Sequence, residues 1–136
     1  MKLEFTVLGT PVAQPRQRHR VVKGIVMNYT PKKHPVQAFK QAIGIKAKEV
    51  YKGKPLTCPL RLSVLCIFPR VSGMPLRGER IWKDTKPDFD NLAKAICDAL
   101  NNVIWRDDSQ VVSAWVEKFY SDSEEEPRVE IEITTL

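Results

Sequence analysis

The segment from Leu60 to Phe68 constrains the fold of this chain more than any other. It alternates apolar and polar side chains as far as Ser63 and then becomes continuously apolar. Alternation is typical of a strand with one buried face, and a short continuous apolar run is typical of a strand buried on both faces. The pattern therefore predicts a central β-strand that is more deeply buried toward its end. The run is far too short to cross a membrane.

Shorter alternating segments predict the other strands, and two longer segments have the period of a helix. The predicted strands cover residues 2–7, 21–22, 25–27, 110–120 and 128–133, and the predicted helices cover residues 35–51 and 88–100. Asp88 is the predicted N-cap of the second helix. We expect an α+β fold in which a small mixed or antiparallel sheet carries two helices on one face, as a single domain over residues 1–136.

Two connections and two tryptophans complete this expectation. Residues 69–87 are rich in proline, glycine and basic side chains, which predicts a basic loop. Residues 121–127 are acidic and are expected to form a solvated turn that joins the last two strands as a hairpin. Trp105 and Trp115 are expected in the core.

Cysteine usage excludes several classes of protein. The chain has three cysteines (Cys58, Cys66 and Cys97), an odd number without a Cys-x-x-Cys pair. This usage argues against a disulfide framework and a structural zinc site, and it favours a reducing, cytoplasmic location. The first residues follow the strand pattern, with Glu4 in it, and therefore differ from a secretory signal. The cysteines are expected to be small core side chains.

Charge is divided unevenly along the chain, although the net charge is only +6. Residues 1–54 hold 12 Lys and Arg against 2 Asp and Glu, and residues 55–86 hold 6 against 2. Residues 87–136 reverse the balance, with 4 against 12. The distribution predicts a cationic surface for a polyanion in the first 86 residues and a separate role for carboxylates in the remainder.

Basic residues in the first 86 positions are the candidate DNA contacts. Three arginines spaced by two would lie on one side of an extended chain, and few acids are interspersed among the basic side chains, which favours phosphate binding over a merely solvated surface. The candidates are Arg16, Arg18, Arg20, Lys32, Lys33, Arg70, Arg77, Arg80, Lys83 and Lys86. Trp82, in the basic loop, either stacks on an opened base or anchors the loop.

Two groups of carboxylates are candidates for chemistry. Asp88 and Asp90 flank the start of the second predicted helix, and Asp107 and Asp108 follow that helix. One interpretation is structural, because acids at a helix start are stabilised as caps. The other is a site in which three carboxylates converge, a set of hard oxygen ligands suited to Mg²⁺ and to hydrolysis of a phosphodiester.

Lys94 has the same two interpretations. It lies four residues after Asp90 and four before Asp98, so the three share one helix face. Lys94 either belongs to a surface series of ion pairs, with Asp98 as its structural partner, or stabilises charge that develops on a phosphate.

Two motifs occur here in a highly specific order. They are Asp88-Phe89-Asp90-Asn91-Leu92-x-Lys94-x-x-x-Asp98-Ala99-Leu100 and Asp107-Asp108-x-Gln110-Val111-Val112. Near the N-terminus stand Gly9-x-Pro11, Arg16-x-Arg18 and Tyr29-Thr30-Pro31. Over nearly the whole chain these residues resemble the RusA family of Holliday-junction resolvases. The loop over residues 77–86 is longer than that pattern leads us to expect.

The resemblance implies a homodimeric, Mg²⁺-dependent endodeoxyribonuclease, with Mn²⁺ able to substitute, that nicks four-way DNA junctions symmetrically in recombination and repair. It implies catalytic roles for Asp88, Asp90, Asp108 and Lys94, with the three carboxylates as the metal ligands. Asp107 also matches the motif, with a lesser role implied. A phage or prophage origin is implied as well.

Two other functions stay open on the sequence. The chain could be a non-catalytic nucleic-acid-binding module whose acids serve only as caps and ion-pair partners. It could also be a related metal nuclease that acts on flaps or other branched DNA. Fold alone does not separate these functions.

Overall fold

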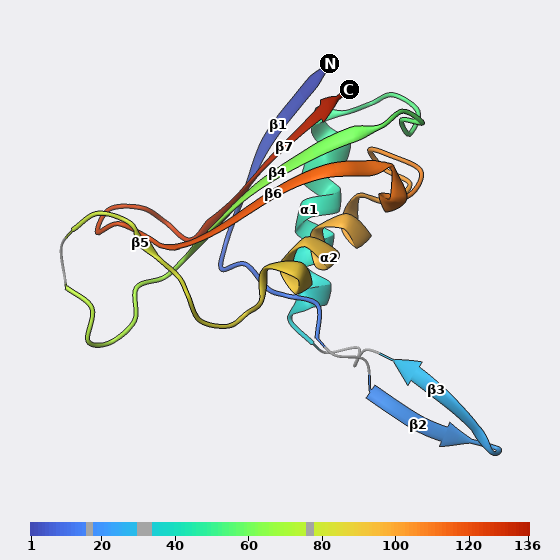
Figure 1. Ribbon diagram of the computed structural model, residues 1–136, viewed down its shortest axis with the longest axis horizontal. Coiled ribbons are helices and arrows are strands. Elements are labelled where there is room, and N and C mark those ends of the chain that lie inside the picture. The colour runs from blue at the N-terminus through green and yellow to red at the C-terminus, as the bar shows by residue number, and fades with distance from the viewer. Residues whose placement is uncertain (16–17, 30–33, 76–77) are drawn as a thin grey trace.

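The central strand predicted from the sequence is the middle strand of a mixed sheet. The computed structural model describes residues 1–15, 18–29, 34–75 and 78–136. Within these residues the main sheet has the strand order β1-β7-β4-β6-β5, with two helices on one face (Figure 1). The strands of this sheet are β1 (Lys2–Leu8), β4 (Leu60–Phe68), β5 (Ile81–Trp82), β6 (Val111–Tyr120) and β7 (Arg128–Thr135). The fold is α+β, as predicted.

β4 has a strand on each side and is buried toward its end. It pairs antiparallel with β7 and parallel with β6. Alternate residues are buried at first, and the last three, Cys66, Ile67 and Phe68, are all buried. The prediction of a central strand with increasing burial is confirmed.

The predicted hairpin between the last two strands is wrong. In the described part of the chain β6 and β7 do not pair, because β4 lies between them. Residues 121–127 instead cross the end of β4, where the Ser121 N–H donates to the Phe68 carbonyl at 2.8 Å. Alternation along a strand reports which face is buried and carries no information on which strand lies beside it.

The expectation that residues 121–127 form a merely solvated turn is also wrong. The Glu125 carboxylate accepts hydrogen bonds from the guanidinium groups of Arg80, at 2.6 Å, and Arg128, at 2.9 Å. These bonds, those of Arg80 above all, lower the pKa of Glu125 to about 2. Glu125 therefore connects the crossing segment to the loop that precedes the second helix.

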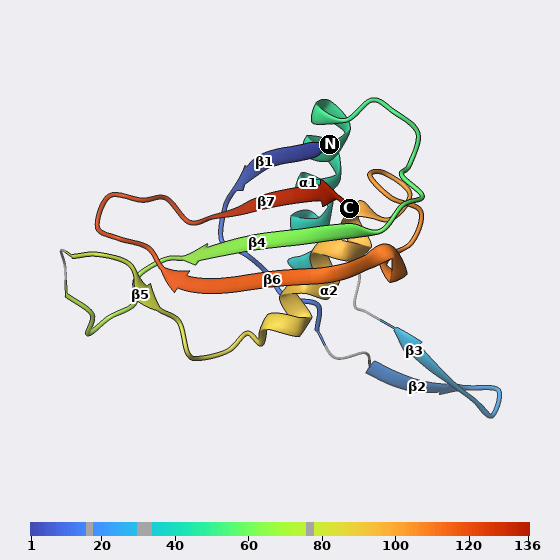
Figure 2. The same ribbon diagram turned by 45° about the horizontal axis from the view of Figure 1, so that its top comes forward.

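Two helices form the second layer. α1 (Val36–Val50) and α2 (Phe89–Leu100) lie on the same face of the sheet, as Figures 1 and 2 show. The apolar positions that predicted each helix, such as Ile43 and Ile96, are buried in the core with Trp105. Neither helix, in the part of the chain that is described, is long and apolar enough to cross a membrane.

Three side chains expected in the interior differ in how far they are covered. Trp115 is 66% exposed, so its assignment to the core is wrong. It lies on the strand face that has no helix over it, and its indole N–H donates to Glu117 at 2.7 Å. Cys66 is buried, as predicted, and burial raises the pKa of its thiol to about 12, whereas Cys97 is only half-buried.

A separate hairpin of β2 (Arg18–Val22) and β3 (Ile25–Tyr29) confirms the prediction of strands around Lys23-Gly24. The two turn residues have positive φ angles of 50° and 79°. A turn with both central residues in this region matches the twist of the paired strands. In both views the hairpin stands apart from the main sheet (Figures 1 and 2).

We predict that Glu125→Gln lowers the free energy of unfolding by about 1–2 kcal/mol at pH 7, since it weakens charge-assisted bonds to two arginines. The folded-state pKa, about 2, lies below the ordinary value of 4.5. The stabilisation is thus complete above pH 4.5 and disappears as the pH falls toward 2. Urea unfolding at several pH values measures this difference. Glu124→Gln, at an exposed neighbour, is the control and should change little; equal effects of the two variants would contradict the assignment.

Candidate active site

Asp88 and Asp90 lie together at the start of α2, with exposed side chains. Asp88 occupies the N-cap position, as predicted, but its side chain makes no capping hydrogen bond to the described residues. The one described group that donates to the Asp90 carboxylate is the N–H of Asn91, at 2.9 Å. Both carboxylates therefore keep most of their oxygen lone pairs available to a ligand, which favours the functional over the purely structural interpretation.

Lys118 of β6 fixes the segment that leads into α2. Its ammonium group donates to the carbonyl oxygens of Thr85 and Pro87, each at 2.8 Å. On the other side of the helix start, the Gln14 N–H donates to the carbonyl of Asn91 at 2.9 Å. The carboxylates of Asp88 and Asp90 are thus carried on a backbone held from two elements. No sequence pattern pointed to Lys118, whose contacts are with backbone atoms far away in the chain.

Lys94 points from the same helix toward solvent, with its side chain 56% exposed. Its ammonium lies 3.8 Å from Asp98, one turn further along, and Asp98 also lies 3.4 Å from Lys40 of α1. The predicted structural pairing of Lys94 with Asp98 is therefore present. The pair is long and solvent-exposed, so it holds Lys94 only weakly.

The two acids that follow α2 differ in what they do. Asp107 precedes a short 3₁₀ turn, η1 (Asp108–Gln110), and its carboxylate accepts from the Ser109 N–H at 3.0 Å. Hydrogen bonds from the Ser109 side chain first, and from its backbone N–H second, lower the pKa of Asp107. The Asp108 backbone carbonyl accepts from the Val111 N–H, but no described residue donates a hydrogen bond to its carboxylate. Asp107 is the capping residue, and Asp108 is the acid left available for chemistry.

Gln110 holds this turn in place and has no counterpart among the predicted site residues. Its amide oxygen accepts from the N–H groups of Arg106, at 3.0 Å, and Asp107, at 2.9 Å. Its amide nitrogen donates to the carbonyls of Leu56, at 2.8 Å, and Cys58, at 3.1 Å. The spacing Asp-x-x-Gln is that of a capping box, so the sequence did contain a signal for it.

A single chain does not bring the three predicted metal ligands together. Asp88 and Asp90 are at one end of α2, and Asp108 follows the other end; a helix of 12 residues is about 18 Å long. The charge of Asp108 acts instead on Cys97, near the C-terminal end of α2, where it adds to burial in raising the thiol pKa to about 12. No group of three acids, histidines or cysteines among the described residues could hold a metal ion. The donor chemistry fits Mg²⁺, whereas the placement within one chain supplies only two of the three ligands.

The predicted DNA contacts fall into three groups. Arg16, Lys32, Lys33 and Arg77 lie outside the described residues, and Arg18 and Arg20 are on β2 of the separate hairpin. In the loop before α2, Arg70 donates to the Glu79 carbonyl at 2.7 Å and Arg80 binds Glu125. Lys83 donates to Thr85 and Tyr120, whereas Lys86 is exposed. Three of the loop cations thus have structural partners, and phosphate binding by any of the ten stays a prediction.

Trp82 of β5 stacks on Phe119, with ring centroids 4.1 Å apart and an angle of 26° between the rings. This contact fits the interpretation of Trp82 as an anchor of the loop. The indole nevertheless remains 65% exposed. Stacking on an opened base stays untested.

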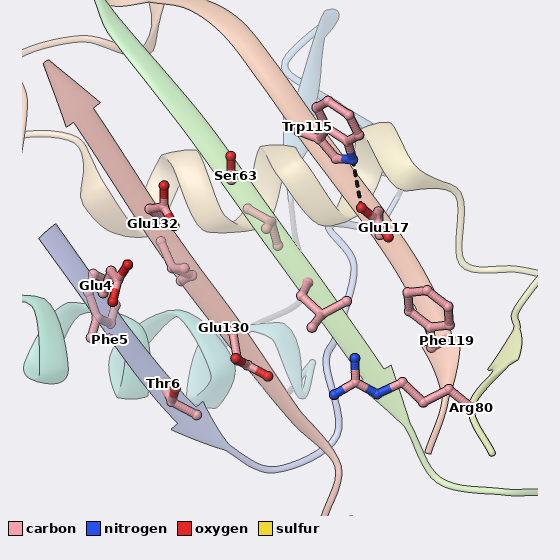
Figure 3. Close-up of a pocket in the computed structure, with 13 residues that line it drawn as sticks. Glu4, Phe5, Thr6, Ser63, Arg80, Trp115, Glu117, Phe119, Glu130 and Glu132 are labelled. Atoms are coloured by element: carbon pink, nitrogen blue, oxygen red, sulfur yellow. Dashed lines mark hydrogen bonds between the residues drawn. The ribbon is translucent and has the colours of Figure 1, made fainter. Parts of the chain in front are cut away.

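The sheet face opposite the helices carries an open groove of about 680 Å³ (Figure 3). Four glutamates line it, against one arginine, Arg80. The glutamates are Glu4, Glu117, Glu130 and Glu132. A surface with this excess of negative charge repels phosphate, so the groove is unsuited to DNA even though it is a large hollow.

The start of α2 carries two carboxylates that are available to a ligand, and the first 86 residues of the chain have an excess of positive charge. Both features are expected of a nuclease. A family model described as Endodeoxyribonuclease RusA matches residues 9–134. The chain therefore belongs to the RusA endodeoxyribonuclease family, which makes it an endonuclease of the junction-resolving type.

Two relatives illustrate this membership. The chain is 40% identical over 139 residues to the "Uncharacterized protein YqaN" of Bacillus subtilis (strain 168), with 96% of this chain and 94% of that protein covered. It is 29% identical over 144 residues to the "Crossover junction endodeoxyribonuclease rusA" of Lactococcus phage r1t, with 99% and 98% covered.

We predict that Gln110→Ala lowers the free energy of unfolding by about 2 kcal/mol, because it removes four hydrogen bonds. Among the described residues, the Arg106 N–H and the Leu56 carbonyl keep their bond to each other, whereas the Asp107 N–H and the Cys58 carbonyl lose their partner. Thermal or urea unfolding measures the change. Arg106→Ala is the matched control beside the same turn and should be nearly neutral, since its side chain is exposed and its contact with Gln110 uses the backbone N–H. A loss as small in Gln110→Ala as in the control would show that the turn does not depend on Gln110.

Proposed function

We propose that this protein is a Mg²⁺-dependent endodeoxyribonuclease that resolves four-way DNA junctions by paired symmetric nicks, in recombination and repair. The observation that carries the proposal is the pair of exposed carboxylates at the start of α2, Asp88 and Asp90, in a chain of the RusA family. The relative from Lactococcus phage r1t, described as a crossover junction endodeoxyribonuclease, supports the choice of substrate and a phage-related origin.

Asp88, Asp90 and Asp108 are the residues that we assign to the metal. When bound, Mg²⁺ supplies a hydroxide nucleophile at neutral pH and neutralises charge on the phosphodiester oxygens, and Mn²⁺ has similar oxygen chemistry. The protein contributes the rigid start of α2, which Lys118 holds through the carbonyls of Thr85 and Pro87. Asp107 is excluded from this set because its carboxylate caps the η1 turn.

Lys94 is assigned to the phosphate. It lies on α2 one turn after Asp90, and in the described part of the chain its exposed ammonium has one ion-pair partner, Asp98, at 3.8 Å. An ion pair of this length in solvent contributes little free energy, so a phosphate can replace Asp98 as the partner of the ammonium. The role of Lys94 is then to stabilise negative charge on the scissile phosphate, with Asp98 keeping the side chain extended along the helix.

The remaining parts of the proposal concern DNA and assembly. The basic residues of the β2–β3 hairpin and of the loop before α2 would bind the DNA arms through phosphates, which gives recognition of shape more than of sequence. Two equivalent cuts on a two-fold junction require two equivalent sites, so we assign the active form to a homodimer. We place the enzyme in the cytoplasm, where bacterial and phage DNA are accessible to it.

We predict that Asp90→Asn abolishes cleavage of a four-way junction while leaving junction affinity unchanged or higher. The loss should exceed about 100-fold, because removing even a hydrogen-bond partner of a metal ligand costs up to that much. Binding should not fall, since the substitution removes a negative charge beside the phosphates. A gel assay for nicking in Mg²⁺ and a binding titration in Ca²⁺ measure the two quantities.

Asp107→Asn is the matched control for that experiment, since it also removes one carboxylate but from the capping residue, and it should keep most of the cleavage. Normal cleavage by Asp90→Asn would contradict the assigned site. Comparing a junction, a flap and plain duplex in the same assay tests the substrate. Preference for flaps would favour the related nuclease, and binding without cleavage of any substrate would favour a non-catalytic module.

We predict that junction affinity falls steeply with salt and that Lys86→Ala reduces the slope of log Kd against log[salt] by about 1, the value for one lost phosphate contact. Lys86 is exposed in the loop before α2. Arg80→Gln is the comparison, because Arg80 is already bound to Glu125 and should change the slope less. A slope that is flat in the unmodified protein would contradict recognition through phosphates.

A further inference from the structure

Thr85 lies in the segment between β5 and α2 and is held both by its side chain and by its backbone. Its hydroxyl accepts from the Lys83 ammonium at 3.0 Å and forms a second hydrogen bond with the Tyr120 hydroxyl, at 3.1 Å. Its carbonyl accepts from the Lys118 ammonium at 2.8 Å. Thr85 is exposed and its segment is neither helix nor strand, so these contacts, and not burial, hold it. We call these four residues the Thr85 clamp.

Within the clamp, the Lys83 side chain is packed against the sheet and is half-buried. Its ammonium lies 4.5 Å from the centre of the Tyr120 ring and 5.0 Å from that of Phe68, and it donates to the Tyr120 hydroxyl at 3.3 Å. An ammonium over an aromatic ring is attracted by the negative face of the ring. Lys83 would have to give up these contacts in order to bind a phosphate, whereas Lys86, in the same loop, is exposed.

Three consecutive residues at the end of β6 hold the loop from opposite faces of the sheet. Tyr120 packs against the hydrophobic core, and Lys118, two residues earlier, shares its face. Phe119 points to the other face, where it lines the open groove (Figure 3) and its ring stacks on Trp82. β6 thus holds the loop at Trp82 and the segment before α2 at Thr85.

The clamp is close in sequence to the first carboxylate of the candidate site. Two residues separate Thr85 from Asp88, and the second of them, Pro87, also accepts from Lys118 through its carbonyl, at 2.8 Å. The Asp88 carbonyl in turn accepts from the Leu92 N–H at 3.2 Å, at the beginning of α2. A displacement of Thr85 is therefore passed to the start of the helix and to the carboxylates that it carries.

We propose that Lys83 and Tyr120 are positioning residues that act through Thr85. They fix the Asp88 and Asp90 carboxylates in the place where a phosphodiester must meet them. Catalytic groups must be held to within about 0.5 Å, and a misplacement of about 1 Å can lower the rate 100-fold. Lys83 is thus assigned to the active site and not to DNA phosphates, for which the sequence made it a candidate. The catalytic consequence rests on the proposed function, whereas the clamp itself does not.

Amide hydrogen exchange tests the clamp without any measurement of cleavage. Tyr120→Phe removes the hydroxyl and keeps the ring, so the Leu92 N–H, which bonds to the Asp88 carbonyl, should exchange about 10-fold faster in NMR measurements. The Ile131 N–H, in the centre of the sheet, should keep its rate. Tyr51→Phe is the matched control, since it also removes a hydroxyl bonded to a backbone carbonyl, at the end of α1. Equal exchange of Leu92 in the two variants would overturn the clamp.

Kinetics and salt dependence separate positioning from phosphate binding. Lys83→Met removes the ammonium and keeps an apolar chain of similar length. It should lower kcat for junction nicking about 10–100-fold, while KM and the slope of log Kd against log[salt] stay unchanged. A lysine that binds phosphate would instead reduce the slope by about 1, as expected of Lys86→Ala. Lys48→Met, at an exposed lysine of α1, is the matched control and should alter neither quantity.

A reduced slope or an unchanged kcat in Lys83→Met would overturn the assignment of Lys83. Tyr120→Phe is the second variant, because it keeps the ring that packs on the core. It should show the same division, with a lower kcat and an unchanged junction affinity. An unchanged kcat in this variant would overturn the positioning role of Tyr120.

A double-mutant cycle tests whether Tyr120 acts through Thr85. Thr85→Val removes the hydroxyl and keeps the carbonyl that Lys118 binds. If the two hydroxyls act through their shared bond, adding Tyr120→Phe to Thr85→Val should lower kcat by less than about two-fold. Effects that simply multiply would overturn the coupling. An unmodified enzyme that does not cleave junctions would overturn the proposed function, while hydrogen exchange would still decide the clamp.

Discussion

Burial of both faces at the end of β4 is the constraint from which the rest of the structure follows. A strand that continues as Val64-Leu65-Cys66-Ile67-Phe68 cannot lie at a sheet edge, so β6 and β7 take the two sides of β4 and cannot pair with each other. Residues 121–127 must then cross the end of β4, where Glu125 binds Arg80 and fixes the loop before α2. The parallel pairing of β4 with β6 in turn places Lys118 where it holds the start of α2. The position of Asp88 and Asp90 therefore depends, through these contacts, on the apolar residues of β4.

Local patterns predicted the elements well, because a single strand or helix records its own burial in its side chains. Both helices, β1, β4 and the β2–β3 hairpin were predicted within a few residues. The neighbours of a strand are a property of the whole chain, and alternation in β6 and β7 allowed a hairpin as readily as the observed separation by β4. Trp115 was assigned to the core on hydrophobicity alone, whereas its strand face carries no helix and leaves it exposed.

Part of the candidate site was predictable because it, too, depends on local sequence patterns. A helix start rich in Asp is visible in the sequence, and so is the Asp-x-x-Gln spacing that makes Asp107 a cap and leaves Asp108 available. What the sequence could not show is that α2 keeps Asp108 away from Asp88 and Asp90 within one chain, because that depends on where η1 lies relative to the helix. The resemblance to a family carries residue roles from one protein to another, but it does not say how far apart those residues lie in this chain.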